Sequence, residues 1–201
     1  MTDFLAVDTS SKYLTVIAKK GDKTVRHYLG ECAMKHSVIL MSEIDEALKQ
    51  ADMAPSDCGF FAAVTGPGSF TGIRIGISAV KGMAFATGKK LLGVTSFDLI
   101  AYNVISCSDF AVAIDAMHGM YYVCGYDKDK KVCVPPCYIS GERVRELNVP
   151  VYGFEQLPLE NYTKLNAGDC LYNAVCALSD NLTDTIHALY VRKSQAEEAR
   201  K

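Results

Sequence analysis

Apolar residues in the first half of the chain recur with two different periods, which predicts both strands and helices. Three short apolar runs open the sequence at 5–8, 13–19 and 24–29, separated by polar turns. Runs of this length and spacing are typical of an antiparallel meander. Over 37–51 the apolar residues instead recur with a helical period, which predicts a helix with a single apolar face.

Between residues 60 and 86 a strand, a glycine turn and a helix are expected to follow one another. The apolar run 60–64 suits a buried strand, Gly66-Pro67-Gly68 ends it, and Ser69 or Thr71 can cap the helix. This helix is apolar on two sides. One side holds Ile73, Ile77, Val80 and Ala84, and the other holds Gly72, Ile75, Gly76, Ala79 and Met83. A surface helix needs one apolar stripe, so the second side indicates either a partner or complete burial within the domain.

The rest of the chain repeats this succession of strands and helices in a weaker form. The further predicted elements are a strand at 91–94, a helix from Ser96 capped by Ser96 or Asp98, strands at 110–115, 121–126 and 132–139, a short helix at 142–146, a strand at 149–153 and a helix at 169–179. Because three strand-like runs begin each half, the sequence predicts an internal duplication with lobes at 1–106 and 107–201. The repeat fades after 139, so the second lobe is expected to be the smaller one.

The glycine turn at 66–68 is a candidate anion site, because a turn before a helix presents free N–H groups. Its spacing fits neither standard nucleotide fingerprint. No Gly-Lys pair follows Gly66 or Gly68 at the offset of a Walker A loop, and the third glycine of a dinucleotide loop would fall on Thr71 instead of Gly72. Spacing alone leaves nucleotide binding as an open alternative.

The composition is that of a soluble globular protein. Of the 201 residues, 49% are hydrophobic and 22% are charged, and the formal net charge is −2. Because nucleic acids are held mainly by Lys and Arg on phosphates, this balance argues against a strong autonomous hold on RNA. The N-terminus has no basic region before its apolar run, and no stretch approaches the ~18 apolar residues of a membrane span. These features predict a cytoplasmic protein without a membrane contact.

The residue types that bind metals are scattered along the chain. The eight cysteines form no Cys-x-x-Cys pair and mostly lie in apolar runs, which indicates reduced, buried thiols in preference to disulfides or metal ligands. The four histidines are far apart, without a spacing that would place two imidazoles on one helix face. No local metal motif is therefore predicted.

Several motifs resemble those of the TsaB family, also called YeaZ. They are Val7-Asp8-Thr9-Ser10, His36-Ser37, the run from Gly66 to Gly76, Lys81-Gly82-Met83-Ala84, Gly93-Val94-Thr95-Ser96, Ile114-Asp115-Ala116 and Leu189-Tyr190-Val191-Arg192. The resemblance implies the duplicated α/β fold of the actin-like, Hsp70-like and sugar-kinase-like (ribonuclease H-like) superfamily, with mixed sheets. It also implies a function, because TsaB is a non-catalytic subunit in the bacterial formation of threonylcarbamoyladenosine beside the tRNA anticodon.

The same resemblance implies partners and argues against catalysis by this chain alone. A TsaD-like paralogue transfers the threonylcarbamoyl group and a TsaE-like ATPase completes the complex, so tRNA is expected to be contacted only through the complex. TsaD-like proteins carry a metal-binding His-x-x-x-His pair, whose positions fall at about Ser96 and Ile100 here. Since Ile100 offers no ligand atom, no cofactor and no catalytic residue are expected.

The two-sided helix and the helix at 37–51 form the predicted contact with the larger paralogue, because small residues such as Gly76 and Ala79 let a partner helix come close. The predicted interface residues are Ser37, Leu40, Met41, Ile44, Gly72, Ile75, Gly76, Ala79 and Met83. When the paralogue is missing, a second copy is expected to cover this apolar face and form a homodimer.

An enzyme of the same superfamily is the alternative function. Asp8-Thr9-Ser10 resembles the first phosphate loop of such small-molecule kinases, and a carboxylate at a strand end can hold hydrated Mg²⁺ beside ATP. The competing interpretation is that Asp8 merely caps its own turn. The loop after Asp115 departs from the family, because Met117-His118-Gly119-Met120-Tyr121 replaces a usually Arg-rich segment, which argues against a polar role of this loop.

Overall fold

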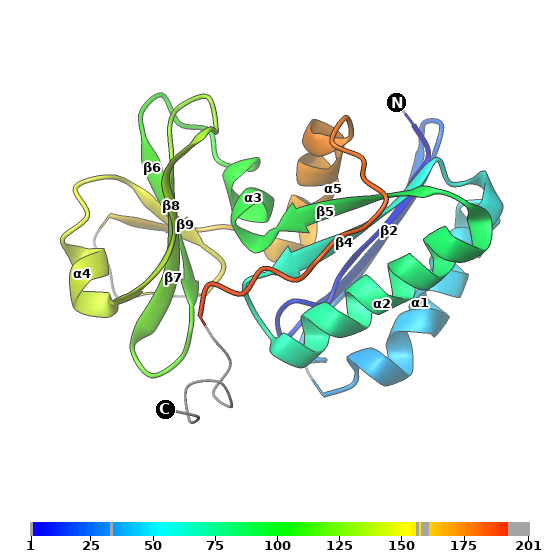
Figure 1. The fold of residues 1–201 in the computed structure, drawn as a ribbon, viewed down its shortest axis with the longest axis horizontal. Helices are drawn as coiled ribbons and strands as arrows, with labels where there is room; N and C mark the ends of the chain where they lie inside the picture. The colour runs from blue at the N-terminus through cyan, green and yellow to red at the C-terminus, as the bar shows by residue number, and fades with distance from the viewer. Residues whose placement is uncertain (1, 33, 156, 158–160, 193–201) are drawn as a thin grey trace.

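A computed structural model describes the chain except residues 1, 33, 156, 158–160 and 193–201. The molecule consists of two α/β lobes that lie side by side, each built on one five-stranded sheet (Figure 1). Within the described part of the chain, no helix combines the length and the apolar character that crossing a bilayer requires.

The first sheet has the strand order β3-β2-β1-β4-β5. Its strands are β1 (Phe4–Asp8), β2 (Leu14–Lys20), β3 (Lys23–Leu29), β4 (Phe60–Gly66) and β5 (Lys90–Thr95). β1 pairs antiparallel with β2 and parallel with β4, so the opening meander continues into a parallel half and the sheet is mixed. Both β1 and β4 are buried along their whole lengths because helices cover the two faces of the sheet.

Side chains along β1 alternate between two separate cores. Leu5 and Val7 pack under α1 (His36–Gln50) and α2 (Phe70–Thr87), whereas Phe4 and Ala6 pack against α5 (Ala167–Leu178). The two predicted long helices of the first lobe therefore share one face of the sheet (Figure 1). A single 3₁₀ turn, η1 (Pro55–Asp57), lies between α1 and β4.

The second lobe repeats the first strand for strand. Its elements are β6 (Phe110–Asp115), β7 (Met120–Tyr126), β8 (Val132–Ser140), α4 (Gly141–Arg145), β9 (Val151–Gly153) and β10 (Tyr162–Lys164). The sheet order is β10-β9-β6-β7-β8, in which β6 takes the place of β1 and β10 that of β5. This arrangement confirms the predicted duplicated α/β fold with mixed sheets.

The repeat continues further than the hydrophobic pattern predicts. β10 is absent from the predicted elements because it has only 3 residues, of which Thr163 and Lys164 are exposed and polar. It nevertheless pairs in parallel with β9, as β5 does with β4. The described residues between β9 and β10 form no helix, whereas α2 stands at that place in the first lobe, so the second lobe is the reduced one.

The last helix of each repeat packs against the other repeat. α3 (Ser96–Ala101) follows β5 and contacts β6 and β7, and α5 follows β10 and contacts β1 and β2. Asn103 fastens these two helices, since its Nδ2 donates to the Cys170 carbonyl at 2.9 Å. The boundary between 106 and 107 stays a prediction, but α5 shows that the second half of the chain contributes a helix to the first sheet.

Side-chain oxygens cap both helices whose starts the sequence left open. Ser69 caps α2, since its Oγ accepts from the Gly72 amide at 3.2 Å. For α3 the predicted caps Ser96 and Asp98 are wrong, because the cap is Thr95, whose Oγ1 accepts from the Asp98 amide at 2.9 Å. Asp98 accepts in return from the Thr95 amide, so the two residues form a reciprocal capping box.

All eight cysteines are free thiols. Four, among them Cys58 and Cys170, are buried as predicted, whereas Cys107 and Cys133 are exposed. Burial raises the pKa of the Cys58 thiol to about 11 and that of Cys170 to about 12, so both thiols stay protonated near neutral pH.

Candidate protein-interaction surface

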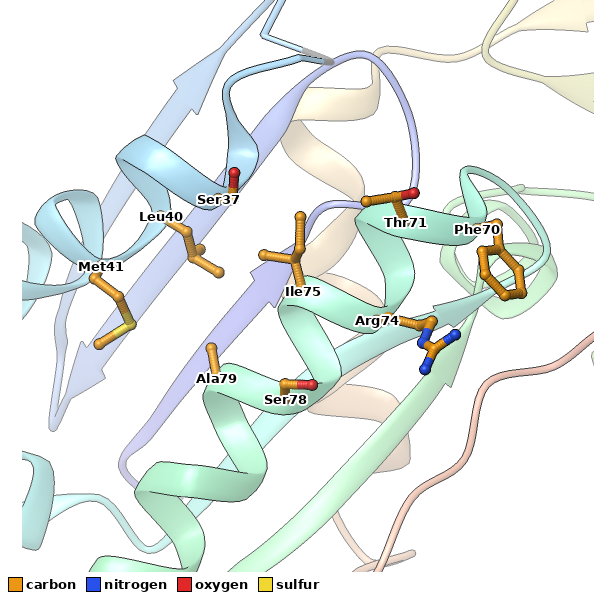
Figure 2. A pocket seen from close by; sticks show the side chains of 9 residues that line it. All are labelled: Ser37, Leu40, Met41, Phe70, Thr71, Arg74, Ile75, Ser78 and Ala79. Carbon is orange, nitrogen blue, oxygen red and sulfur yellow. The ribbon is translucent and has the colours of Figure 1, made fainter.

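A groove of about 510 Å³ lies along the outer side of α1 and α2 (Figure 2). It is lined by Ser37, Leu40, Met41, Phe70, Thr71, Arg74, Ile75, Ser78 and Ala79. These residues come from the start of α1 and the first half of α2, two helices that pack side by side on the first sheet. The groove can take up an apolar helix or an extended segment of another protein.

Five of the nine predicted interface residues line this groove: Ser37, Leu40, Met41, Ile75 and Ala79. Ser37 and Met41 are exposed, Ile75 and Ala79 are half-buried, and Leu40 is buried beneath them. The structure therefore brings together, on two different helices, residues that the sequence placed on separate apolar faces.

Of the other predicted interface residues, Ile44, Gly72 and Gly76 are buried inside the protomer, which corrects the assignment of helix faces, and Met83 lies outside the groove. Ile44 belongs to the core under α1, and Met83 packs against the same core from a half-buried position. Gly72 and Gly76 face the loop after β1: a Cβ would lie 2.0 Å from the Thr9 carbonyl oxygen at Gly72 and 2.5 Å from Thr9 Oγ1 at Gly76. The prediction that Gly76 makes room for a partner helix is wrong, because its small size admits Thr9 of the same chain.

Four groove residues were not predicted from the sequence: Phe70, Thr71, Arg74 and Ser78. The Phe70 ring is half exposed, stacks on Tyr190 with the ring centroids 5.3 Å apart, and carries the Arg74 guanidinium 5.1 Å from its centroid. A Phe and an Arg four positions apart on a helix are surface neighbours, so that spacing was an available signal. The stack with Tyr190 could not be predicted, because its partner comes from the far end of the chain.

The segment 179–192, named the strap below, fixes the second ring of this stack. Thr183 forms a β-bridge with Leu91 at the edge of the first sheet, and the Leu189 amide donates to the Thr65 carbonyl at 2.8 Å. Figure 1 shows the strap in orange and red as it leaves α5 and runs past β5 toward the second lobe. One ring of the aromatic stack, Phe70, is therefore held by α2, and the other, Tyr190, is held by a strap whose backbone is hydrogen-bonded to the first sheet.

The loop after β1 fills the space over the glycine turn. The Ser10 carbonyl accepts from the Ser69 amide at 2.7 Å, and a Cβ on Gly68 would lie 2.2 Å from that same oxygen. A phosphate site at the start of α2 would need this amide, which is already bonded to protein. The residues present therefore do not fit a nucleotide phosphate at the glycine turn.

Asp8 caps its own turn inside the protein. It is 1% exposed, and its Oδ1 accepts from the Ser10 amide at 2.8 Å. Burial raises the pKa of the Asp8 carboxyl, an effect that hydrogen bonds to Ser10 and the nearby His36 only partly oppose. Asp115, the matching residue at the end of β6, makes the same turn through the Met117 amide at 2.8 Å, but it is exposed.

The positions that correspond to the paralogue's histidine pair lie in α3. Ser96 is buried, and Ile100 is completely buried in the core that α3 forms with β6 and β7. Within the described residues, no group of three or more His, Cys, Asp and Glu side chains could hold a metal ion. The side chains at these positions do not fit the metal of the paralogue, because Ile100 has no donor atom.

A family of tRNA-modifying proteins matches most of the chain. Its model, described as TsaD, tRNA N6-adenosine threonylcarbamoyltransferase, aligns with residues 30–189. The chain belongs to this family.

Within the family, the named relatives of the chain confirm the TsaB resemblance. The chain is 33% identical to the tRNA threonylcarbamoyladenosine biosynthesis protein TsaB of Bacillus subtilis over 99 aligned residues. These residues make up 49% of this chain and 43% of that protein. The chain is 30% identical over 129 residues to the protein of the same name from Escherichia coli, which is 63% of this chain and 55% of that protein. The chain spans about half the length of the curated relatives that it matches.

Solved structures agree with this membership at the level of the fold. A Pseudomonas aeruginosa protein described as similar to peptidase YEAZ superposes with a TM-score of 0.79 and covers 96% of this chain and 100% of its own. The two sequences are 24% identical, so the likeness shows a common YeaZ fold. The name of that structure assigns no activity to this TsaB-type chain.

Proposed function

We propose that this chain is a partner subunit of the machinery that forms threonylcarbamoyladenosine in tRNA, and that it docks through the α1–α2 groove on a larger TsaD-like threonylcarbamoyltransferase. The observation that carries the proposal is the groove, an apolar and open face in a protein whose TsaB relatives are named for this pathway. Open apolar surfaces of this kind mark interaction sites on soluble proteins.

In this proposal the chain contributes no catalytic residue. The support comes from Ile100 at a position where the paralogue has a metal ligand, and from Asp8, whose carboxyl is buried in its own turn. The kinase alternative finds no support among the described residues, because Ser10 covers the glycine turn that would hold a phosphate.

The remaining partners follow from the same proposal. A TsaE-like ATPase completes the complex, and tRNA is held only through the assembled complex, since a chain of net charge −2 holds phosphates weakly by itself. The setting is the cytoplasm. Without the paralogue, a second copy covers the groove and the chain forms a homodimer.

The substitution Ala79→Arg tests the docking surface. It places an unpaired guanidinium in the groove, where burial without a partner costs about 3–5 kcal/mol, so affinity for the paralogue should fall by at least ~100-fold. Pull-down of the paralogue and tRNA modification by the reconstituted mixture should both be lost. Ala177→Arg is the matched control, because Ala177 is exposed on α5 outside the groove and its variant should bind like the wild type.

Circular dichroism shows whether each variant is folded. If Ala79→Arg does not fold, Met41→Glu takes its place in the test, because Met41 is an exposed residue of the groove. Normal binding by a folded groove variant would contradict the proposed surface. Threonylcarbamoyl transfer by this chain in the absence of the paralogue would contradict the non-catalytic role.

A further inference from the structure

We propose that Arg74 is the specificity-determining residue of the groove and that it binds a carboxylate of the docked paralogue. The inference rests on the proposed function for the identity of the occupant, and it adds the chemistry that the occupant must present. The fitting partner is a helix with an apolar face and one Asp or Glu that reaches the Phe70 end of the groove.

Arg74 is exposed, and its guanidinium lies over the Phe70 ring, 5.1 Å from the ring centroid. In the part of the chain that the structure describes, it forms no ion pair and no hydrogen bond. Figure 2 shows the Arg74 and Phe70 side chains pointing to the same side of α2, away from Met41. A guanidinium that lies on an aromatic ring keeps its N–H edges free for a carboxylate.

The platform under the guanidinium is held in place before any partner binds. Phe70 stacks on Tyr190 at 5.3 Å between centroids, and the neighbouring Leu189 amide is bonded to the Thr65 carbonyl at 2.8 Å. A side chain that is already ordered loses less conformational entropy when it binds. Aromatic residues and arginine at the edge of an apolar groove are also the residue types that dominate binding energies at protein interfaces.

Charge decides what can cover this groove. Arg74 is the only charged residue among those that line it, and α2 contains no Asp or Glu. An occupant that excludes water from the groove buries this cation, which is costly unless the occupant supplies an anion. A second copy placed groove against groove brings only another Arg74 among the lining residues, so the charge favours a different protein that carries a carboxylate, and a second copy covers the groove only when that protein is missing.

Titration of the purified paralogue into Arg74 variants tests the inference. Arg74→Gln should weaken binding at least about tenfold, because it leaves the partner's carboxylate without its counter-charge, and Arg74→Glu should weaken it further. Arg74→Lys should lose only about threefold, since it keeps the charge but not the planar donor pair. The affinity of Arg74→Gln should also depend less on salt than that of the wild type.

Arg145→Glu is the matched control for Arg74→Glu. Arg145 is exposed on α4 of the other lobe, and the two substitutions change the net charge by the same amount. Its binding should equal that of the wild type. Replacing exposed Asp and Glu residues of the paralogue with Arg, one at a time, should identify one variant that restores binding to Arg74→Glu.

The outcomes separate this inference from the proposed function. If Ala79→Arg abolishes binding while Arg74→Glu binds normally, the groove docks the paralogue but the carboxylate contact is refuted. If both variants bind normally, the docking surface itself is wrong. If Arg74→Glu alters only the self-association of the chain in sedimentation, the groove belongs to a second copy and the inference is overturned.

Discussion

Asp8 carries a carboxyl group that the fold has removed from water. Its Oδ1 is bonded to the Ser10 amide at 2.8 Å, while its Oδ2 has no partner among the described residues. Thr15, which faces Asp8 across the β1–β2 pair, has a buried hydroxyl that is likewise unpartnered there. Burial therefore favours the protonated form of this carboxyl more than water does, whereas binding of Mg²⁺ requires the carboxylate.

Asp8→Asn should reveal this raised pKa in the stability of the protein. In the native state the pKa of Asp8 is raised above its ordinary value of 3.8, so the native state binds more protons than the unfolded state. The wild type therefore loses stability as the pH rises from 3.8 through the raised native pKa. The unfolding free energy of Asp8→Asn relative to the wild type should therefore increase with pH over that window and then level off. Urea unfolding at a series of pH values measures the difference, with Asp115→Asn as the control. A difference that falls with rising pH would show that Asp8 is stabilised as the anion.

At the scale of elements, α2 shows what a hydrophobic pattern can and cannot specify. The period predicted the helix and its two apolar sides, and Ser69 was one of the two caps that the sequence offered, the other being Thr71. The hydrophobic period could not predict which side of α2 faces the protomer, because a glycine counts as neither apolar nor polar in such a pattern. Its neighbours in the fold decide whether it is buried. The hydrogen bond from Thr9 Oγ1 to the Gly72 carbonyl, at 2.7 Å, settles the face through a residue that is distant in sequence.

Three glycines of α2 should therefore respond differently to alanine. Gly72→Ala should lower the unfolding free energy by more than about 2 kcal/mol, because its Cβ would overlap the Thr9 backbone. Gly76→Ala should cost about 1–3 kcal/mol against the Thr9 side chain. Gly82→Ala has open space around its Cβ and should stabilise by about 0.5–1 kcal/mol through helix propensity. Equal stability of the first and third variants in thermal unfolding would refute this packing.

At the scale of the whole molecule, the duplication was predictable from strand order, whereas the contacts between the repeats were not. α3 packs against strands of the second lobe, and α5 packs against strands of the first, which lie far away from it in sequence. The hydrophobic pattern of a helix does not indicate which sheet the helix covers. The Phe70–Tyr190 stack has the same origin. The sequence accordingly predicted the apolar centre of the α1–α2 groove but not its charged, aromatic end at Phe70 and Arg74.

Peroxide oxidation of methionines, read by mass spectrometry, tests the central claim most directly, because Met41 lies in the groove and Met117 lies on the second lobe. Their side chains are comparably accessible in the free chain, at 55% and 65% exposure. With saturating paralogue, the oxidation rate of Met41 should fall at least about threefold while that of Met117 stays unchanged, since sulfoxide formation follows exposure. An unchanged rate at Met41 in a complex that has demonstrably formed would contradict docking through the α1–α2 groove.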